Sequence, residues 1–182
     1  MNTGYRSYFL AVFLIIISTV INAAVPRDPY AYFFNEMLGD FPEELALARD
    51  EGKKGILIFF EQDDCPFCHR MKETVLNQPE VQDYFRKHFL TFAINIEGNR
   101  EIVAFNGEQM SEKDFAFKIH RVRATPVFAF FDLEGKRIVR YTGPTSGVQE
   151  FMWLGEFVEK GLYKSTNFTK YKREKKDSQR QE

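Results

Sequence analysis

The sequence predicts an α/β sandwich with a mixed β-sheet. Apolar runs of strand length alternate with helix-like segments, and their order is β-α-β followed by β-β-α, which places both halves on one sheet. A pair of short runs around Asn106-Gly107 predicts a β-hairpin inserted between the halves. At 182 residues, with 44% apolar and 28% charged residues, the chain fits one globular domain and is neither a disordered polymer nor a polytopic membrane protein.

The first half of the pattern has one strand covered on both faces. Residues 55–60, GILIFF, form an uninterrupted apolar run, which is typical of a buried strand. Residues 89–96, FLTFAINI, are a second strand candidate. The helices of this half are predicted at residues 41–50, 66–76 and 79–88.

The inserted hairpin, at residues 101–110, stands between the two halves and leads into the second. Ser111 resembles the first residue of a capping box, so a helix is expected from there to His120. Two strands, residues 127–131 and 137–141, are joined by a Glu134-Gly135 turn. A last amphipathic helix is expected over residues 146–160.

The N-terminus has the form of an export signal. Phe9 to Ile21 is a thirteen-residue apolar run, and Asn22, Ala23 and Ala24 follow it as small residues suited to cleavage. As a helix the run spans only about 20 Å, short of a bilayer core of about 30 Å. We therefore expect residues 1–24 to be a signal peptide, residues 25–161 to be the folded domain, and the mature protein to be periplasmic or secreted with no membrane span. An uncleaved N-terminal anchor is the alternative.

The C-terminal residues 162–182 are rich in charge. Between Lys164 and Glu182 there are seven basic and three acidic residues, a local net charge of +4. A charged, flexible tail is the simpler prediction, and a docking surface for an acidic partner is the sharper one. The whole chain has 25 basic and 26 acidic residues, a balance that disfavours nucleic-acid binding. We expect a monomer.

The chemistry is concentrated in the segment Asp63-Asp64-Cys65-Pro66-Phe67-Cys68-His69. This segment lies where the buried strand passes into a helix, and Pro66 suits the first helical turn. Cys65 would lie at the helix N-terminus, where free N–H groups and the helix dipole favour the reactive thiolate. Cys68, one turn further, could resolve a mixed disulfide. The spacing predicts thiol–disulfide exchange by Cys65 and Cys68.

Three other uses of the two cysteines remain open. A purely structural disulfide would close a loop of about four residues and contribute only about 2 kcal/mol. A zinc site needs about four ligands, and only three histidines accompany the two cysteines, so no metal is expected. Cys65-Pro66-Phe67-Cys68-His69 also matches the attachment pattern of c-type haem, although the α/β pattern disfavours a small cytochrome.

A second motif supports thiol exchange. Ala124-Thr125-Pro126 stands directly before the strand VFAFF, where a cis-proline can begin a strand. Together with Cys-Pro-Phe-Cys after GILIFF, this resembles the thioredoxin superfamily over roughly residues 41–161, and implies a three-layer α/β/α sandwich. FFEQDDCPFCHRM, NQPEVQDYF, EIVAFNG and ATPVFAFFDLEGK are similar to the SoxW-type exported thioredoxins.

The resemblance implies a function and a site. It implies an exported thiol–disulfide oxidoreductase with no cofactor beyond its redox-active disulfide, acting on exported cysteine-containing proteins and re-reduced by a membrane thiol donor. Catalysis would fall to Cys65 and Cys68, with Cys65 the solvent-accessible nucleophile. Pro66 and Phe67, together with Thr125 and Pro126, would bind substrate or tune the sulfur pair. A non-redox binding protein is the alternative.

The sequence departs from thioredoxin around the cysteines. Thioredoxin has Trp before the first cysteine and Gly-Pro between the two, where this chain has Asp64 and Pro66-Phe67. Pro-Phe is closer to the glutaredoxin pair Pro-Tyr, but the Gly-Gly of a glutathione site is missing. Phe59 takes the place of thioredoxin's buried acid, so Glu61, on the same strand face, is the candidate for proton transfer. A plain solvent-exposed glutamate is the alternative.

Overall fold

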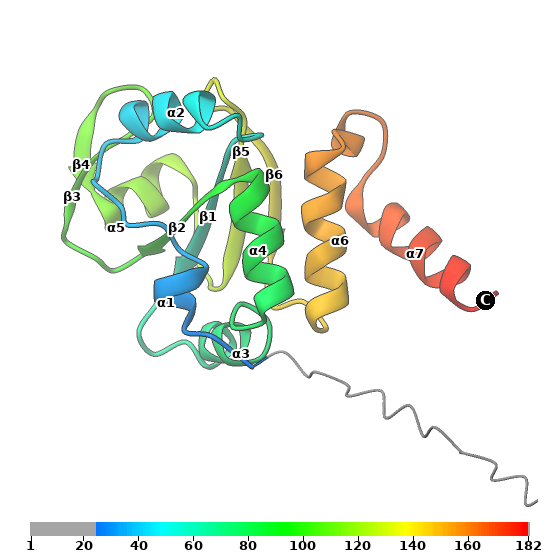
Figure 1. The fold of residues 1–182 in the computed structure, drawn as a ribbon. Coiled ribbons are helices and arrows are strands. Elements are labelled where there is room, and N and C mark those ends of the chain that lie inside the picture. The colour runs from blue at the N-terminus through cyan, green and yellow to red at the C-terminus, as the bar shows by residue number, and fades with distance from the viewer. Residues whose placement is uncertain (1–24, 182) are drawn as a thin grey trace, which may run out of the picture.

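The protein is described here by a computed structural model covering residues 25–181, and its centre is a four-stranded mixed sheet in the order β2-β1-β5-β6 (Figure 1). Strand β2 runs parallel to β1, whereas β5 pairs antiparallel with both β1 and β6. The strands are β1 (Ile56–Glu61), β2 (Leu90–Asn95), β3 (Glu101–Val103), β4 (Gln109–Ser111), β5 (Val127–Phe131) and β6 (Arg137–Thr142). The helices are α1 (Pro29–Tyr32), α2 (Phe41–Asp50), α3 (Pro66–Thr74), α4 (Pro79–His88), α5 (Glu112–Asp114), the π-helical η1 (Phe115–Ile119), α6 (Val148–Glu159), the 3-10 turn η2 (Leu162–Lys164) and α7 (Phe168–Gln179).

The sheet separates two apolar clusters, which confirms the predicted three-layer sandwich. All six residues of β1 are buried, because helices cover both faces of this strand. Leu57 and Phe59 face one cluster with Cys65, Cys68 and helices α3, α4 and α6. The alternate residues of β1 face the other cluster, under α2 and the β3–β4 hairpin (Figure 1).

Local sequence signals account for most of the element boundaries. The Asp40 carboxylate accepts the N–H of Glu43 at 2.9 Å and begins α2, which has Pro42 in its first turn. The predicted hairpin is present as β3 and β4, which pair antiparallel. Strand β5 has the bounds that the apolar run predicts.

The helix expected from Ser111 to His120 is broken into two kinds of turn. Ser111 caps it as predicted, since its hydroxyl accepts the N–H of Asp114 at 3.1 Å. After α5 the chain changes to the π-helix η1, and His120 bonds back to the Phe115 carbonyl. Arg121 follows with φ of 53°, a left-handed conformation that cannot continue a helix.

The expectation of a flexible C-terminal tail is wrong for most of its length. Helix α7 packs against α6, and the rings of Phe168 and Tyr171 lie 5.6 and 5.5 Å from that of Phe157. Lys172 and Lys175 form ion pairs with Glu150 and Glu156 of α6. Two aromatic residues among the lysines thus give α7 an apolar face, which a prediction based on the net charge of the tail does not detect.

Residues 25–35 form a segment with little regular structure that packs beside α3. It contains α1, one short turn capped by Asp28, whose carboxylate accepts the N–H of Tyr30. The two residues that follow, Phe33 and Phe34, are buried in the cluster around Cys68. The predicted signal peptide, residues 1–24, lies outside the described residues. Within residues 25–181, no helix is long and apolar enough to cross a membrane.

Candidate active site

Cys65 and Cys68 form a disulfide at the N-terminus of α3. Cys65 is the residue that begins the helix, and its sulfur accepts the N–H of Cys68 at 3.1 Å. Pro66 stands in the first turn, where its missing N–H leaves no intrahelical bond unmade. The predicted placement of the pair, at the junction between β1 and α3, is therefore confirmed.

The two cysteines differ in exposure, but less than we expected. Cys68 is fully buried, whereas Cys65 keeps 5% of its surface exposed. Cys65 is therefore a nearly buried residue with one accessible edge, and not an openly exposed thiol. The two residues between the cysteines are both exposed, and Phe67 keeps 51% of its surface accessible.

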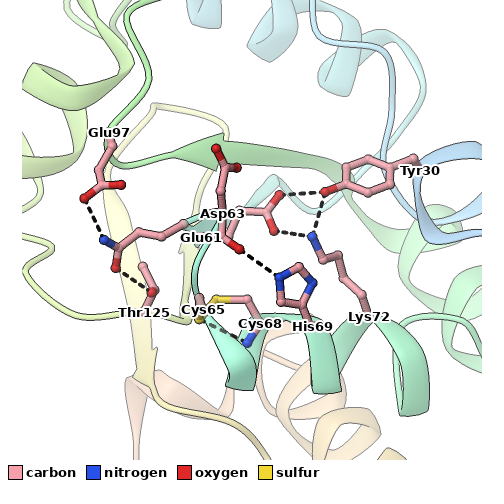
Figure 2. The surroundings of a disulfide bond; sticks show 10 residues. Tyr30, Glu61, Asp63, Cys65, Cys68, His69, Lys72, Glu97 and Thr125 are labelled. Carbon is pink, nitrogen blue, oxygen red and sulfur yellow. Dashed lines mark hydrogen bonds and ion pairs between the residues drawn. A yellow bond between two sulfur atoms is a disulfide. The ribbon is translucent and has the colours of Figure 1, made fainter.

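The loop with Thr125 and Pro126 lies beside the cysteine loop. The Thr125-Pro126 peptide bond is cis, as predicted. In the register of β1 and β5, Phe60 lies opposite Val127, so Pro126 enters the sheet next to the end of β1 that leads to Cys65. The Thr125 hydroxyl donates to Oε1 of Gln62 at 2.9 Å, and Gln62 in turn donates to Glu97 at 3.0 Å (Figure 2). The Thr125 side chain thus binds the cysteine loop through Gln62.

Glu61 is buried and paired, not the exposed glutamate of the alternative prediction. Its carboxylate accepts Nζ of Lys72 at 2.6 Å and the hydroxyl of Tyr30 at 3.0 Å. Lys72 also donates to Tyr30 at 2.7 Å, which closes a three-membered network. Figure 2 shows the network on the side of the disulfide opposite Thr125. Lys72 lies four residues after Cys68 on α3, and therefore on the same helical face.

Lys72 stays protonated and Tyr30 stays neutral at neutral pH. Burial alone would lower the pKa of Lys72, but hydrogen bonds to Glu61 and Tyr30 outweigh it and the pKa is raised. Burial raises the pKa of the Tyr30 phenol, and the Glu61 carboxylate adds to this effect. Tyr30 is therefore a neutral donor beside a carboxylate–ammonium pair.

His69 fixes the loop before the disulfide. Its Nε2 lies 2.8 Å from the carbonyl oxygen of Asp63, and since a carbonyl only accepts, Nε2 carries the proton. The two cysteine sulfurs form a disulfide, and the His69 ring is held by a hydrogen bond to the loop that precedes Cys65. Over residues 25–181 there is no group of three or more potential metal-binding side chains.

A groove of about 630 Å³ runs along α3 beside the disulfide. One wall is formed by residues 26–30 and the other by the face of α3 that carries His69, Lys72 and Glu73, with Asp63 at the end near the cysteines. We call it the α3 groove. Residues of the N-terminal segment thus contribute directly to the surroundings of the disulfide.

The structure adds residues that the sequence reasoning missed. Lys72 could have been predicted from the sequence as a neighbour of Cys68, because it follows Cys68 by one helical turn. Tyr30 could not have been predicted. It lies 31 positions from its partner Glu61, in a segment whose sequence has no regular pattern. Gln62 was equally hidden, since its partner Thr125 is 63 positions away.

Comparison with known proteins extends these observations. The thioredoxin-like domain family matches residues 41–159. No curated protein matches the chain significantly. A thioredoxin-fold protein from Helicobacter pylori is 27% identical with a TM-score of 0.59, and the match covers 69% of this chain and 86% of that one. A putative disulphide-isomerase from Bacteroides thetaiotaomicron is 25% identical with a TM-score of 0.53, covering 74% and 93%.

Proposed function

Because this chain belongs to the thioredoxin-like domain family and is a thiol–disulfide oxidoreductase, we propose that it reduces or exchanges disulfides in exported partner proteins. The observation that carries the proposal is the Cys65–Cys68 disulfide at the N-terminus of α3. Free N–H groups and the helix dipole at that position stabilise an anionic sulfur. A reduced Cys65 is therefore placed to act as the nucleophile.

The proposed reduction proceeds in two exchanges. The Cys65 thiolate attacks one sulfur of the partner's disulfide, that disulfide breaks, and its second sulfur leaves as a thiolate. Cys68 then loses its proton and attacks the Cys65 sulfur, which forms the Cys65–Cys68 disulfide and releases the first partner sulfur. The two partner thiolates take up protons. Two electrons pass from this protein to its partner, and a membrane thiol donor returns two electrons.

The surroundings of Cys65 suit contact with a polypeptide. Phe67, two residues after Cys65, offers an exposed apolar ring, and the exposed Pro66 stands between them in sequence. Thr125 and Pro126 lie at the entrance of β5, so the Thr125 backbone is placed to pair with an extended partner segment. We assign these four residues to substrate binding.

Proton transfer to and from Cys68 is assigned to Glu61. This carboxylate is on the same face of β1 as Phe59, the face that packs on the cluster around Cys68. Its ion-pair partner Lys72 lies on the same face of α3 as Cys68, so the ion pair connects Glu61 to the helix that carries Cys68. The pair supplies both a proton acceptor and a compensating positive charge.

The export of the protein and the choice of partners remain predictions from the sequence. The apolar run from Phe9 to Ile21 and the small residues after it support export to the periplasm or beyond the cell. In that location, cysteine-containing exported proteins are the available substrates. The narrower similarity to SoxW-type thioredoxins is part of the same proposal.

An insulin-reduction assay tests the proposed activity. With a dithiol as electron source, the wild-type protein is expected to accelerate precipitation of the insulin chains, and Cys65→Ser is expected to abolish the acceleration. The reduction potential against glutathione then gives the direction, since a value near that of thioredoxin, about −270 mV, favours a reductase and one near about −120 mV an oxidase. Equal rates for wild type and Cys65→Ser would refute the proposal.

A further inference from the structure

We propose that the α3 groove binds a basic side chain of the partner polypeptide, within about four residues of the cysteine that exchanges with Cys65. This inference rests on the proposed function and adds a substrate preference to it. The groove and the disulfide are adjacent because Asp63 and His69, which line the groove, flank the two cysteines in sequence.

The size and direction of the groove suit an extended segment of polypeptide. Its lining on α3 extends from His69 to Glu73, and Glu73 lies eight residues after Cys65, the residue that begins this helix. Eight residues of helix correspond to about 12 Å. An extended chain rises about 3.3 Å per residue, so about four residues cover that distance. A partner side chain up to four positions from the reacting cysteine therefore reaches the groove.

The positive groups of the groove already have partners. Arg27 pairs with Asp83 at 3.0 Å, and its guanidinium lies over the ring of Tyr32. Lys72 pairs with the buried Glu61. Neither cation is therefore available to neutralise the carboxylates that line the groove.

Three carboxylates of the groove are left without an ion pair. Within residues 25–181, Asp28, Asp63 and Glu73 form no salt bridge, although Asp28 caps α1 and Asp63 accepts the side-chain N–H of Asn95 at 3.2 Å. Their summed charge makes the groove attract cations. Since the walls exclude part of the solvent, this attraction is stronger than on an open surface.

The other wall of the groove suits the stem of a long basic side chain. Tyr30 is 56% exposed, and Pro26 and Pro29 lie beside it in the lining. Arginine and lysine pack their methylene groups on such surfaces and keep the charge near carboxylates. An acidic partner side chain would instead meet three like charges.

The position of the groove matches the path of a partner segment. Figure 2 shows Thr125 on one side of the disulfide and His69, Lys72 and Tyr30 on the other. A segment that pairs with the Thr125 backbone and crosses Cys65 continues toward His69 and the groove. The partner would then be held at two separate points, with its exchanging cysteine at Cys65 and its basic residue in the α3 groove.

The test uses synthetic peptides with one cysteine, each supplied as a mixed disulfide with glutathione. Two arginines, two glutamines or two glutamates are placed two to four positions from the cysteine, on either side in separate peptides. With the reduced protein, we expect the arginine peptides to be reduced about 3- to 10-fold faster than the glutamate peptides at low salt, and the ratio to fall toward one at high salt.

Charge-removing variants locate the effect. Glu73→Gln, and the double variant Asp63→Asn with Glu73→Gln, are expected to reduce the preference while the glutamine peptide reports the intrinsic reactivity of the thiols. Glu134→Gln is the matched control. This exposed glutamate lies in the turn that follows β5, whereas Pro126 precedes that strand, so the two residues are at different ends of β5. An equal loss of preference in the control would contradict the proposal.

The remaining outcomes are also decisive. Equal rates for all peptides would overturn the groove proposal and leave the proposed function intact, whereas no reduction of any peptide would overturn the function itself. Inhibition by free arginine amide as strong as that by a serine-substituted arginine peptide would show that the groove takes a small cation, which contradicts a polypeptide site.

Discussion

Cys65 has two structural functions, because its sulfur is bonded to Cys68 and also accepts the N–H that begins α3. Reduction removes the first bond but leaves the sulfur at the helix N-terminus. The helix then stabilises the negative charge that nucleophilic attack requires. The fully buried Cys68 has no comparable access to a partner.

The order of attack can be tested by trapping. Cys68→Ser is expected to accumulate a covalent complex between Cys65 and its partner, because no second thiol releases it. Cys65→Ser is expected to trap nothing. Non-reducing electrophoresis of the exporting cells measures both. Complexes in Cys65→Ser and none in Cys68→Ser would reverse the assignment.

Glu61 is predicted to affect both stability and proton transfer. Glu61→Gln leaves Lys72 without its carboxylate partner, so we expect a loss of about 1–3 kcal/mol in the free energy of unfolding. We also expect kcat for disulfide reduction to fall about 10- to 100-fold, with KM little changed and the pH profile shifted.

The matched control is Glu51→Gln, which removes a more exposed ion pair with Lys53. Such surface pairs contribute about 0–1 kcal/mol, so stability and rate should both stay close to wild type. A Glu61→Gln variant with the wild-type pH profile would show that Glu61 is structural only.

At the scale of elements, α7 is anchored on α6 through a buried carboxylate. Glu150 accepts Nζ of Lys172 at 2.7 Å, the Ser146 hydroxyl at 2.6 Å and the Tyr141 hydroxyl at 2.9 Å. Burial alone would raise the pKa of Glu150, but these bonds outweigh it and lower the pKa to about 2. One side chain thus joins α7, β6 and the start of α6.

The Glu150 contacts predict a pH-dependent contribution of α7. Because the folded pKa lies below the usual value, the stabilisation is complete above about pH 4.5 and is lost as the pH falls toward about 2. Lys172→Met is expected to lower the free energy of unfolding by about 1–3 kcal/mol at pH 7 and by less at pH 3. Urea unfolding at both pH values measures this. Lys176→Met, on the exposed side of the same helix, should have little effect.

His120 is a second pH-sensitive element, at the end of η1. Its ring lies among those of Phe60, Phe115 and Phe131, and its Nε2 has no hydrogen-bond partner within residues 25–181. Burial, reinforced by the nearby Arg137 and Arg140, lowers its pKa to about 4. Folding therefore favours the neutral ring.

This environment predicts a loss of stability in mild acid. The contribution of a neutral His120 is complete above about pH 6.5 and is lost as the pH falls toward about 4, by up to about 3 kcal/mol. His120→Phe removes the unpaired nitrogen, so we expect it to be more stable than wild type, and increasingly so from pH 7 to pH 4. Thermal unfolding at these pH values measures the difference, and a constant difference would contradict the prediction.

At the scale of the whole molecule, the layer that holds the disulfide is closely packed. Helices α4 and α6 approach each other at Gly155, where an added Cβ would lie 2.8 Å from ring atoms of both Tyr84 and Phe85. The ring of Phe85 stacks on Phe151 at 4.4 Å, within the cluster that contains Cys68. A shift of α4 or α6 would therefore displace side chains of the cluster that contains Cys68.

Gly155→Ala is predicted to destabilise the protein although alanine is the better helix former. The propensity gain is about 1 kcal/mol, whereas overpacking a dense core costs about 1–3 kcal/mol. We expect a net loss in the free energy of unfolding, measured by urea denaturation. A variant more stable than wild type would show that the two rings move aside at little cost.

The sequence by itself determined the sandwich, the position of Cys65 and Cys68 at a strand–helix junction, and the cis bond before Pro126. Each of these depends on neighbours in sequence, such as an apolar run, a proline in a first turn or a proline at a strand entrance. Local signals of this kind do not need the rest of the fold.

Only the tertiary structure decided the partners of Glu61, the docking of α7 and the existence of the α3 groove. Tyr30 reaches Glu61 across 31 positions, and Lys172 reaches Glu150 across 22. Such contacts depend on how separate elements pack, and packing depends on shapes and register that no local pattern contains. The cysteines and the candidate proton-transfer residue Glu61 were therefore visible in the sequence, whereas the partners of Glu61 and the proposed substrate groove became visible only in the folded protein.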